Sequence, residues 1–231
     1  ARFVRHWHEI SINKAGFNLK HNEAIYSSYK WFPYNKGGGY RKWYGLNQYL
    51  VNWYKNGKDI HNYNNIPLNY AGAPVRAKQF YFLEGLTYNL ISSGGLFASR
   101  YIEKGFIFDV GGSMIFSKNN DYNDLKKLIS LTNSKILSFL LNIINPTFNY
   151  QVGDIAKLPY VDYQDNDVNI LSDNNILIAK KDWDSYEISW DFTISPLINN
   201  KKNLQFSYQG WKSKVKDDFI RLHQNEEKIN K

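Results

Sequence analysis

The sequence predicts an α+β fold, in which a domain with a mixed sheet is followed by a mainly helical extension. Short runs of aromatic and β-branched residues, separated by glycines, occur between residues 79 and 117, and such runs are typical of strands. Apolar residues recur at helical spacing in two later stretches, 124–144 and 211–229, and this spacing is typical of amphipathic helices. With 231 residues, of which 43% are hydrophobic, the chain can bury a sizeable core.

The strand predictions begin at a run of three glycines, Gly37-Gly38-Gly39. Aromatic residues on both sides predict a hairpin with strands at 29–33 and 40–44 and the glycines at its turn. The following segment, 55–76, is rich in Asn, Gly and Pro, which indicates a long surface loop. Further strands are expected at 79–82, 86–91, 96–102, 106–110 and 113–117, with Gly111-Gly112 as a tight turn between the last two.

Helices are predicted downstream of these strands. One begins at Asp124 and a second covers 135–144, because Thr-Asn-Ser at 132–134 ends the first helix and caps the second. A terminal amphipathic helix is expected over about 211–229. Its apolar face consists of Trp211, Val215, Phe219 and Leu222, and we expect this face to pack on the sheet-containing domain.

Composition divides the chain into three parts. Residues 162–173 are acidic and polar, as is typical of a linker. We therefore expect residues 1–19 to be the end of an inter-domain connection, residues 20–160 to form the sheet-containing domain, and residues 161–231 to form the helical extension. The large side chains of Trp183, Trp190 and Phe192 are expected to anchor packing in that extension.

Positive charge is concentrated at the start of the chain. The net charge is +8, and residues 1–60 hold ten Lys or Arg against three Asp or Glu. A solvated basic face would explain the charge, whereas a positive field that attracts phosphate would also explain the aromatic residues interleaved with it. The chain has no cysteine, which excludes disulfides and thiolate metal sites and fits a cytoplasmic location. No apolar run is long enough to span a bilayer, so we expect no membrane association.

Patterns for catalysis and cofactor binding are incomplete. Asn145-Pro146-Thr147-Phe148 differs by one residue from the Asn-Pro-Pro-Phe motif of amino-methyltransferases, and the proline it lacks shapes the loop that holds the flipped base. The triple glycine is followed by Tyr40-Arg41 instead of the Lys-Ser/Thr of a phosphate loop. His6 and His8 have no third metal ligand at a known spacing. We therefore predict no catalytic, cofactor-binding or metal-binding residue in this chain.

Several segments, taken in order, carry a family resemblance. They include the aromatic-glycine run at 30–47, the segment 94–116 with Arg100-Tyr101, the segment 145–159 and the run Trp183-Asp184-Ser185-Tyr186-Glu187. Together with residues 1–9 and 225–227, they resemble the downstream part of the PglX-type adenine-specific DNA methyltransferases of BREX phage-exclusion systems. The resemblance spans essentially the whole chain.

This resemblance implies a role in DNA recognition. Residues 20–160 would be the target-recognition domain, similar in plan to the specificity subunits of restriction-modification systems. The catalytic domain, which would use S-adenosylmethionine to methylate an adenine, would lie N-terminal to this region. The implied partners are double-stranded DNA, the protein's own N-terminal methyltransferase domain and other phage-defence proteins.

Candidate DNA contacts are basic or amide side chains next to predicted turns, together with glycines that allow close backbone approach. They are Lys36, Gly37, Gly38, Arg41, Lys42, Arg76, Lys78, Arg100, Lys118 and Asn119. Two other functions remain open. The apolar face of the terminal helix would suit a module that docks another defence component. The 17% aromatic content and abundant Asn would suit a carbohydrate-binding module.

Overall fold

The fold combines two small sheets with seven α-helices in the part of the chain that the computed structural model describes, residues 2–91, 96–147, 149–160, 166–198 and 203–231. The first sheet has the order β1 (Val4–His6), β3 (Tyr49–Asn52), β2 (Trp31–Asn35), β6 (Ile107–Phe108). Its pairs are antiparallel except β2 with β6, which are parallel. The second sheet is antiparallel, with the order β5 (Ser99–Ile102), β4 (Gly85–Tyr88), β7 (Met114–Ile115). The predicted α+β class with a mixed sheet is confirmed.

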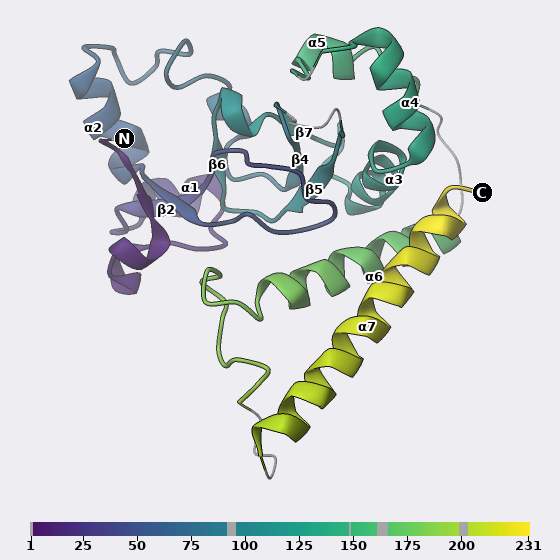
Figure 1. Cartoon of the computed structure of the whole chain (residues 1–231). Coiled ribbons are helices and arrows are strands. Elements are labelled where there is room, and N and C mark those ends of the chain that lie inside the picture. Colours follow the sequence, from purple (N-terminus) through teal and green to yellow (C-terminus); the bar gives the residue numbers. More distant parts are fainter. Residues whose placement is uncertain (1, 92–95, 148, 161–165, 199–202) are drawn as a thin grey trace.

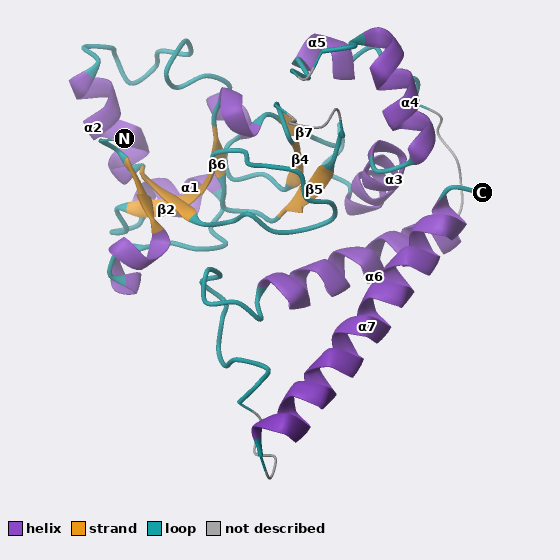
Figure 2. Ribbon diagram, in the orientation of Figure 1, coloured by secondary structure: helices purple, strands orange, loops and turns teal. Residues whose placement is uncertain are grey.

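The helices surround these sheets (Figure 1, Figure 2). α1 and α2 lie beside the first sheet, α3 to α5 lie beyond the second, and α6 and α7 converge toward the C-terminus. Short 3-10 turns occur at Trp7–Glu9, Ile12–Lys14, Lys78–Phe80 and Val110–Gly112. The α-helices are α1 (His21–Tyr26), α2 (Tyr54–Tyr63), α3 (Tyr122–Thr132), α4 (Lys135–Ile144), α5 (Val152–Ile155), α6 (Asn166–Trp183) and α7 (Leu204–Ile229).

Side-chain caps explain where the later helices begin. Asp121 accepts a hydrogen bond from the backbone N–H of Asn123 at the start of α3, and Ser134 accepts one from Leu137 at the start of α4. Such caps satisfy backbone donors that have no partner within the helix. The predicted bounds of α4 and its break from α3 are therefore confirmed. No described helix is by itself long and apolar enough to cross a bilayer; α3 and α4 reach that length only as a pair bent by 69°.

Apolar packing forms three clusters that join the elements. The first is centred on Phe32 and Phe82 beside the first sheet. The second joins β4 through Leu86 to α3 and α6, and Trp183 at the end of α6 is part of it. The third holds α4 against β4 through Leu141 and Tyr88. Burying a side chain of this size stabilises the fold by about 1.5–3 kcal/mol. The helical extension thus shares a core with the second sheet, and Trp183 is confirmed as a packing anchor.

The strand pairing differs from the prediction around the glycine-rich segments. Residues 40–44 do not form a strand, and β2 pairs instead with β3, so that residues 36–48 become a long connection. Within this connection only a single bridge, between Trp43 and Arg100, joins a sheet. The tight hairpin at Gly111-Gly112 is also wrong, because β6 belongs to the first sheet and β7 to the second. This glycine pair crosses from one sheet to the other.

Other segments have a different secondary structure from that expected. The predicted strand at 79–82 is replaced by the 3-10 turn Lys78–Phe80, which follows Ala77 in the left-handed conformation. The predicted loop 55–76 contains most of α2. The predicted linker 162–173 is helical from Asn166 onward, as the first part of α6, which packs into the second cluster through Ile176, Ala179 and Trp183. Residues 162–165 and the predicted boundary at residue 161 lie outside the described residues.

The terminal helix is longer than predicted and only partly packed. α7 begins at Leu204 instead of residue 211. Of its predicted apolar face, Leu222 packs on the second cluster, whereas Val215 is 41% and Phe219 is 68% exposed. The expectation that this whole face packs on the sheet-containing domain is therefore wrong, since α7 contacts the body of the molecule mainly near its C-terminal end (Figure 1).

Candidate nucleic-acid interface

A cleft of about 510 Å³ lies where the connection between the two sheets meets the start of α5. One wall is the loop that precedes the Lys78–Phe80 turn, and another is the segment that links β6 to β7. The N-terminal turn of α5 completes it. Side chains that give the cleft its chemistry are Arg76, Asp109, Val110, Ser113, Met114, Gln151 and Val152.

A close backbone contact positions the rim of this cleft. Gly37 has a φ of +83°, and a Cβ on it would lie 1.9 Å from the carbonyl oxygen of Gly111. Only glycine can occupy such a position without moving the neighbouring chain. The exposed residue Lys36 is thereby held next to Gly111, which follows the cleft residue Val110.

Buried hydrogen bonds between the two sheets hold the same region. The side-chain amide of Asn35 donates to Thr87 Oγ1 at 2.7 Å and to the carbonyl oxygen of Gly112 at 2.9 Å. Its carbonyl oxygen accepts from the backbone N–H of Gly37 at 3.1 Å. Because all these groups are satisfied in a buried seam, they specify one arrangement of the glycine segments.

The carboxylate of Asp109, which lines the cleft, already accepts hydrogen bonds from within the protein. The hydroxyl of Tyr34 donates to the carboxylate of Asp109. The pKa of Tyr34 is raised, mainly because the side chain is buried and secondly because of the Asp109 carboxylate. Asp109 also accepts from the backbone N–H of Gly111 at 2.8 Å. Arg76 and Gln151 are exposed. The cleft therefore offers to solvent one cation and one amide, which are side chains that contact phosphates and base edges.

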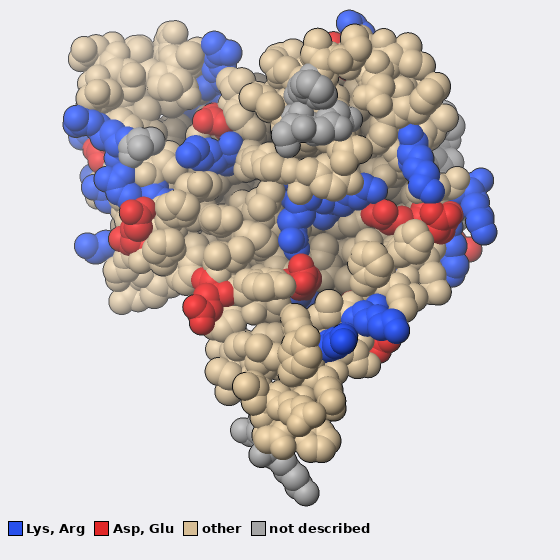
Figure 3. All heavy atoms as spheres, in the orientation of Figure 1, with Lys and Arg blue, Asp and Glu red and all other residues tan. Residues whose placement is uncertain are grey.

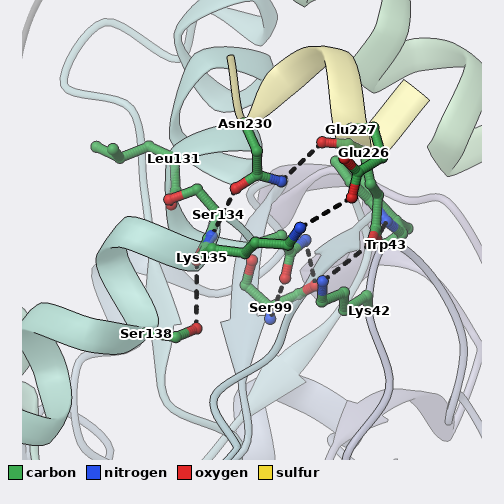
Figure 4. A network of polar contacts seen from close by, with 11 residues as sticks. Lys42, Trp43, Ser99, Leu131, Ser134, Lys135, Ser138, Glu226, Glu227 and Asn230 are labelled. Atoms are coloured by element: carbon green, nitrogen blue, oxygen red, sulfur yellow. Dashed lines mark hydrogen bonds and ion pairs between the residues drawn. The ribbon is translucent and has the colours of Figure 1, made fainter. Parts of the chain in front are cut away.

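The predicted DNA contacts fall into two groups. Lys36, Gly37 and Arg76 lie at the cleft or its rim, and Gly38 continues the exposed connection. Arg41 and Lys42 instead face the two long helices. Arg41 pairs with Asp182 on α6 at 2.8 Å, and Lys42 pairs with Glu226 on α7 at 3.2 Å (Figure 4). The charges of these two residues are thus largely balanced within the protein.

The remaining predicted contacts are separate from the cleft. Arg100 is only 1% exposed. Lys78 donates to the carbonyl oxygen of Leu68 at 2.6 Å and is half-buried. Lys118 and Asn119 are exposed in the turn that precedes α3. The cleft residues Gln151 and Ser113 were not predicted; the only sequence signal for Gln151 was its place within the matched segment 145–159.

Asn145 serves the local turn. Its side-chain amide donates to the carbonyl oxygen of Asn149 at 2.7 Å and to Asp154 at 2.6 Å, while its oxygen accepts from the N–H of Thr147 at 2.9 Å. Phe148, the last residue of the incomplete motif, lies outside the described residues. Within the described part of the chain, no three His, Asp or Glu side chains are grouped as metal ligands.

Tryptophan side chains contribute mainly to packing. Trp43, Trp53 and Trp183 are at most 3% exposed, and the other four are half-buried. Sugar-binding modules present exposed aromatic faces to their ligand. The tryptophans therefore do not form such a face, although several tyrosines are exposed, Tyr26 to 89%.

Known proteins resemble this chain over essentially its whole length. No family model matches it. It is 35% identical over 226 residues to the adenine-specific methyltransferase BrxX of Escherichia coli O9:H4 (strain HS), covering 96% of this chain and 17% of that protein. It is 33% identical over 250 residues to the adenine-specific methyltransferase PglX of Lacticaseibacillus casei (strain Zhang), covering 100% of this chain and 19% of that protein. The chain thus spans less than a fifth of the length of these curated relatives. The resemblance found in the sequence is confirmed: this chain corresponds to one segment of the BrxX and PglX adenine-specific methyltransferases.

Proposed function

We propose that this chain is the DNA target-recognition segment of an adenine-specific DNA methyltransferase that acts in phage defence of the BREX type. The observation that carries the proposal is the similarity, over 96–100% of the chain, to a limited segment of two adenine-specific methyltransferases. The S-adenosylmethionine site and the methyl transfer would belong to another part of the protein. This segment would act with that methyltransferase domain, on double-stranded DNA, in the cytoplasm.

The physics of base methylation supports this division of roles. A methyltransferase must extrude its target base, so a separate lobe has to hold the duplex and read the flanking base pairs. Holding the duplex needs cations at phosphates. Arg76 is exposed in the cleft, and Lys36 is exposed beside it, with its backbone against Gly111 and its Nζ over the ring of Tyr49. Reading needs side chains with paired donors and acceptors, and Gln151 has that chemistry. Figure 3 shows further Lys and Arg side chains on the body of the molecule.

Duplex binding measured by fluorescence anisotropy tests this proposal. In a salt series from about 50 to 200 mM, we expect log K to fall linearly with log salt concentration. Replacing both Lys36 and Arg76 with Ala should reduce the slope by about two phosphate contacts, each contributing about 0.9. The matched control replaces Lys212 and Lys216, two exposed lysines on α7, and should change the slope less. Absence of salt-dependent binding by the wild-type chain would contradict the proposal.

Docking of another phage-defence protein is a second candidate, favoured by one observation. Tyr208 is 48%, Val215 41% and Phe219 68% exposed on one face of α7, and a contiguous row of exposed apolar side chains is typical of protein contacts. If docking is the main role, replacing Phe219 with Ser should abolish co-elution with the other components of the defence system and leave DNA binding unchanged. Co-elution unaffected by that substitution would contradict it.

A further inference from the structure

Arg100 is a buried cation without an acidic partner in the described part of the chain. It is 1% exposed, and its side chain makes one long hydrogen bond, from Nη1 to the carbonyl oxygen of Gly39 at 3.3 Å. Its Nε has no hydrogen-bond partner among the described residues. The charge that acts on it most is that of Arg41, which has the same sign. Desolvation, with Arg41 as a second cause, lowers the pKa of Arg100 to about 10.

Such an arrangement opposes folding. Removing a cation from water carries a large desolvation penalty, which is offset only where an anion and further hydrogen bonds compensate it. An apolar side chain of similar length at this position would avoid the penalty. The protein therefore retains at position 100 a guanidinium that its own fold leaves incompletely paired, and such groups are concentrated at functional sites.

The carbonyl that accepts from Arg100 belongs to Gly39, the last of three consecutive glycines. Gly38 and Gly39 are exposed, and a Cβ on Gly39 would meet nothing within 4 Å. The Gly39 carbonyl that accepts from Arg100 therefore belongs to a residue with open space around its Cα. The exposed cation Lys36 lies at the start of the same segment.

We propose that Arg100 is a reserve phosphate ligand: when DNA binds, the exposed residues Gly38 and Gly39 move aside and a backbone phosphate replaces the Gly39 carbonyl on the guanidinium. The assignment rests on the proposed DNA-binding function and adds to it a specific inner contact. Lys36 meets the DNA first, and Arg100 engages once the glycines have moved. A guanidinium suits this role because its fixed fork of donors matches the oxygens of a phosphate.

The experiment compares thermal unfolding and duplex binding for Arg100→Met. Met is unbranched and adapts to irregular spaces in a core. We expect a Tm equal to or above that of the wild type, together with duplex affinity reduced by about tenfold, as for the loss of one charged hydrogen bond, and a salt slope reduced by about one contact. Arg221→Met removes an exposed arginine on α7 and serves as the control; its affinity should change less.

Each outcome decides the inference. Wild-type binding with unchanged affinity in Arg100→Met would overturn the phosphate role and leave the proposed function standing. A clearly lower Tm, or failure of the variant to fold, would mean that the core needs Arg100 and would overturn the claim that it is held for a ligand. No duplex binding by the wild-type chain would overturn the proposed function, and this inference with it.

Discussion

Glu226 is expected to be the side chain that holds the end of α7 on the body of the protein, and Glu226→Ala tests this (Figure 4). Its carboxylate accepts from Trp43 Nε1 at 2.7 Å and from Lys42 Nζ at 3.2 Å. Both residues belong to the long connection between β2 and β3. Asn230, which follows the last residue of α7, extends the contact, because its side-chain oxygen accepts from the backbone N–H of Lys135 at the start of α4.

The magnitude follows from what the substitution leaves unpaired. Trp43 is 1% exposed, and an indole N–H buried without an acceptor costs about 1–3 kcal/mol. The pair with Lys42 is about one quarter exposed and adds about 0–1 kcal/mol. We therefore expect the free energy of unfolding to fall by about 1–4 kcal/mol. For a chain of this size, that loss lowers Tm by roughly 2–16 °C.

Calorimetry on Glu226→Ala, Glu226→Gln and Lys42→Met separates the two contributions. The Gln variant retains an acceptor for the indole, so it should lose only the part due to the ion pair. Lys42→Met should lose a similar small amount. Equal Tm values for the Ala and Gln variants would refute the reasoning, since the indole hydrogen bond would then carry little of the stability.

Two further predictions concern a glycine and a buried histidine. Gly37→Ala should lower Tm strongly in thermal unfolding, because its Cβ would overlap the carbonyl oxygen of Gly111 and its φ of +83° disfavours a side chain. Burial lowers the pKa of His61, and Lys78 lowers it further, so the unfolded chain binds a proton more readily. The free energy of unfolding should therefore fall as pH drops through 6.5, until the folded histidine also titrates. Urea titrations at several pH values measure this fall, and it should be smaller in His61→Gln than in the wild type.

A control for the glycine prediction lies two residues away. Gly39→Ala adds the same methyl group where nothing lies within 4 Å, so its Tm should be close to that of the wild type. A Gly37→Ala variant as stable as Gly39→Ala would contradict the close contact. An unchanged acid profile in His61→Gln would remove His61 as a source of the pH dependence.

Local patterns in the sequence were sufficient for several helices. The Thr-Asn-Ser break predicted α4 with its observed bounds, Lys135–Ile144, because a cap is a contact between residues three apart. The helical periodicity at the C-terminus likewise predicted α7, although its first two turns, residues 204–210, were missed. The α+β class followed from the change in period between the strand-rich and the helix-rich parts.

Strand pairing required the tertiary structure. β2 pairs with β6 through Tyr34 and Ile107, which are far apart in the sequence. The two glycines at 111 and 112 suggested a hairpin, yet the chain uses them to pass between sheets, where Asn35 and Gly37 press against them. Local propensity carries no information about such a distant contact, because the free energy comes from packing between segments.

The sequence by itself determined the fold class, the concentration of positive charge and the relationship to adenine-specific methyltransferases, because composition, short-range periodicity and ordered motifs are properties of the chain alone. Only the tertiary structure decided which cations face solvent. Arg41 and Lys42 stand in the same basic run as Lys36, but acidic residues on α6 and α7 pair with the first two and leave Lys36 exposed. Whether a cation is paired depends on which acidic side chains lie next to it in the fold, and for Arg41 and Lys42 these come from segments more than a hundred residues away in the sequence.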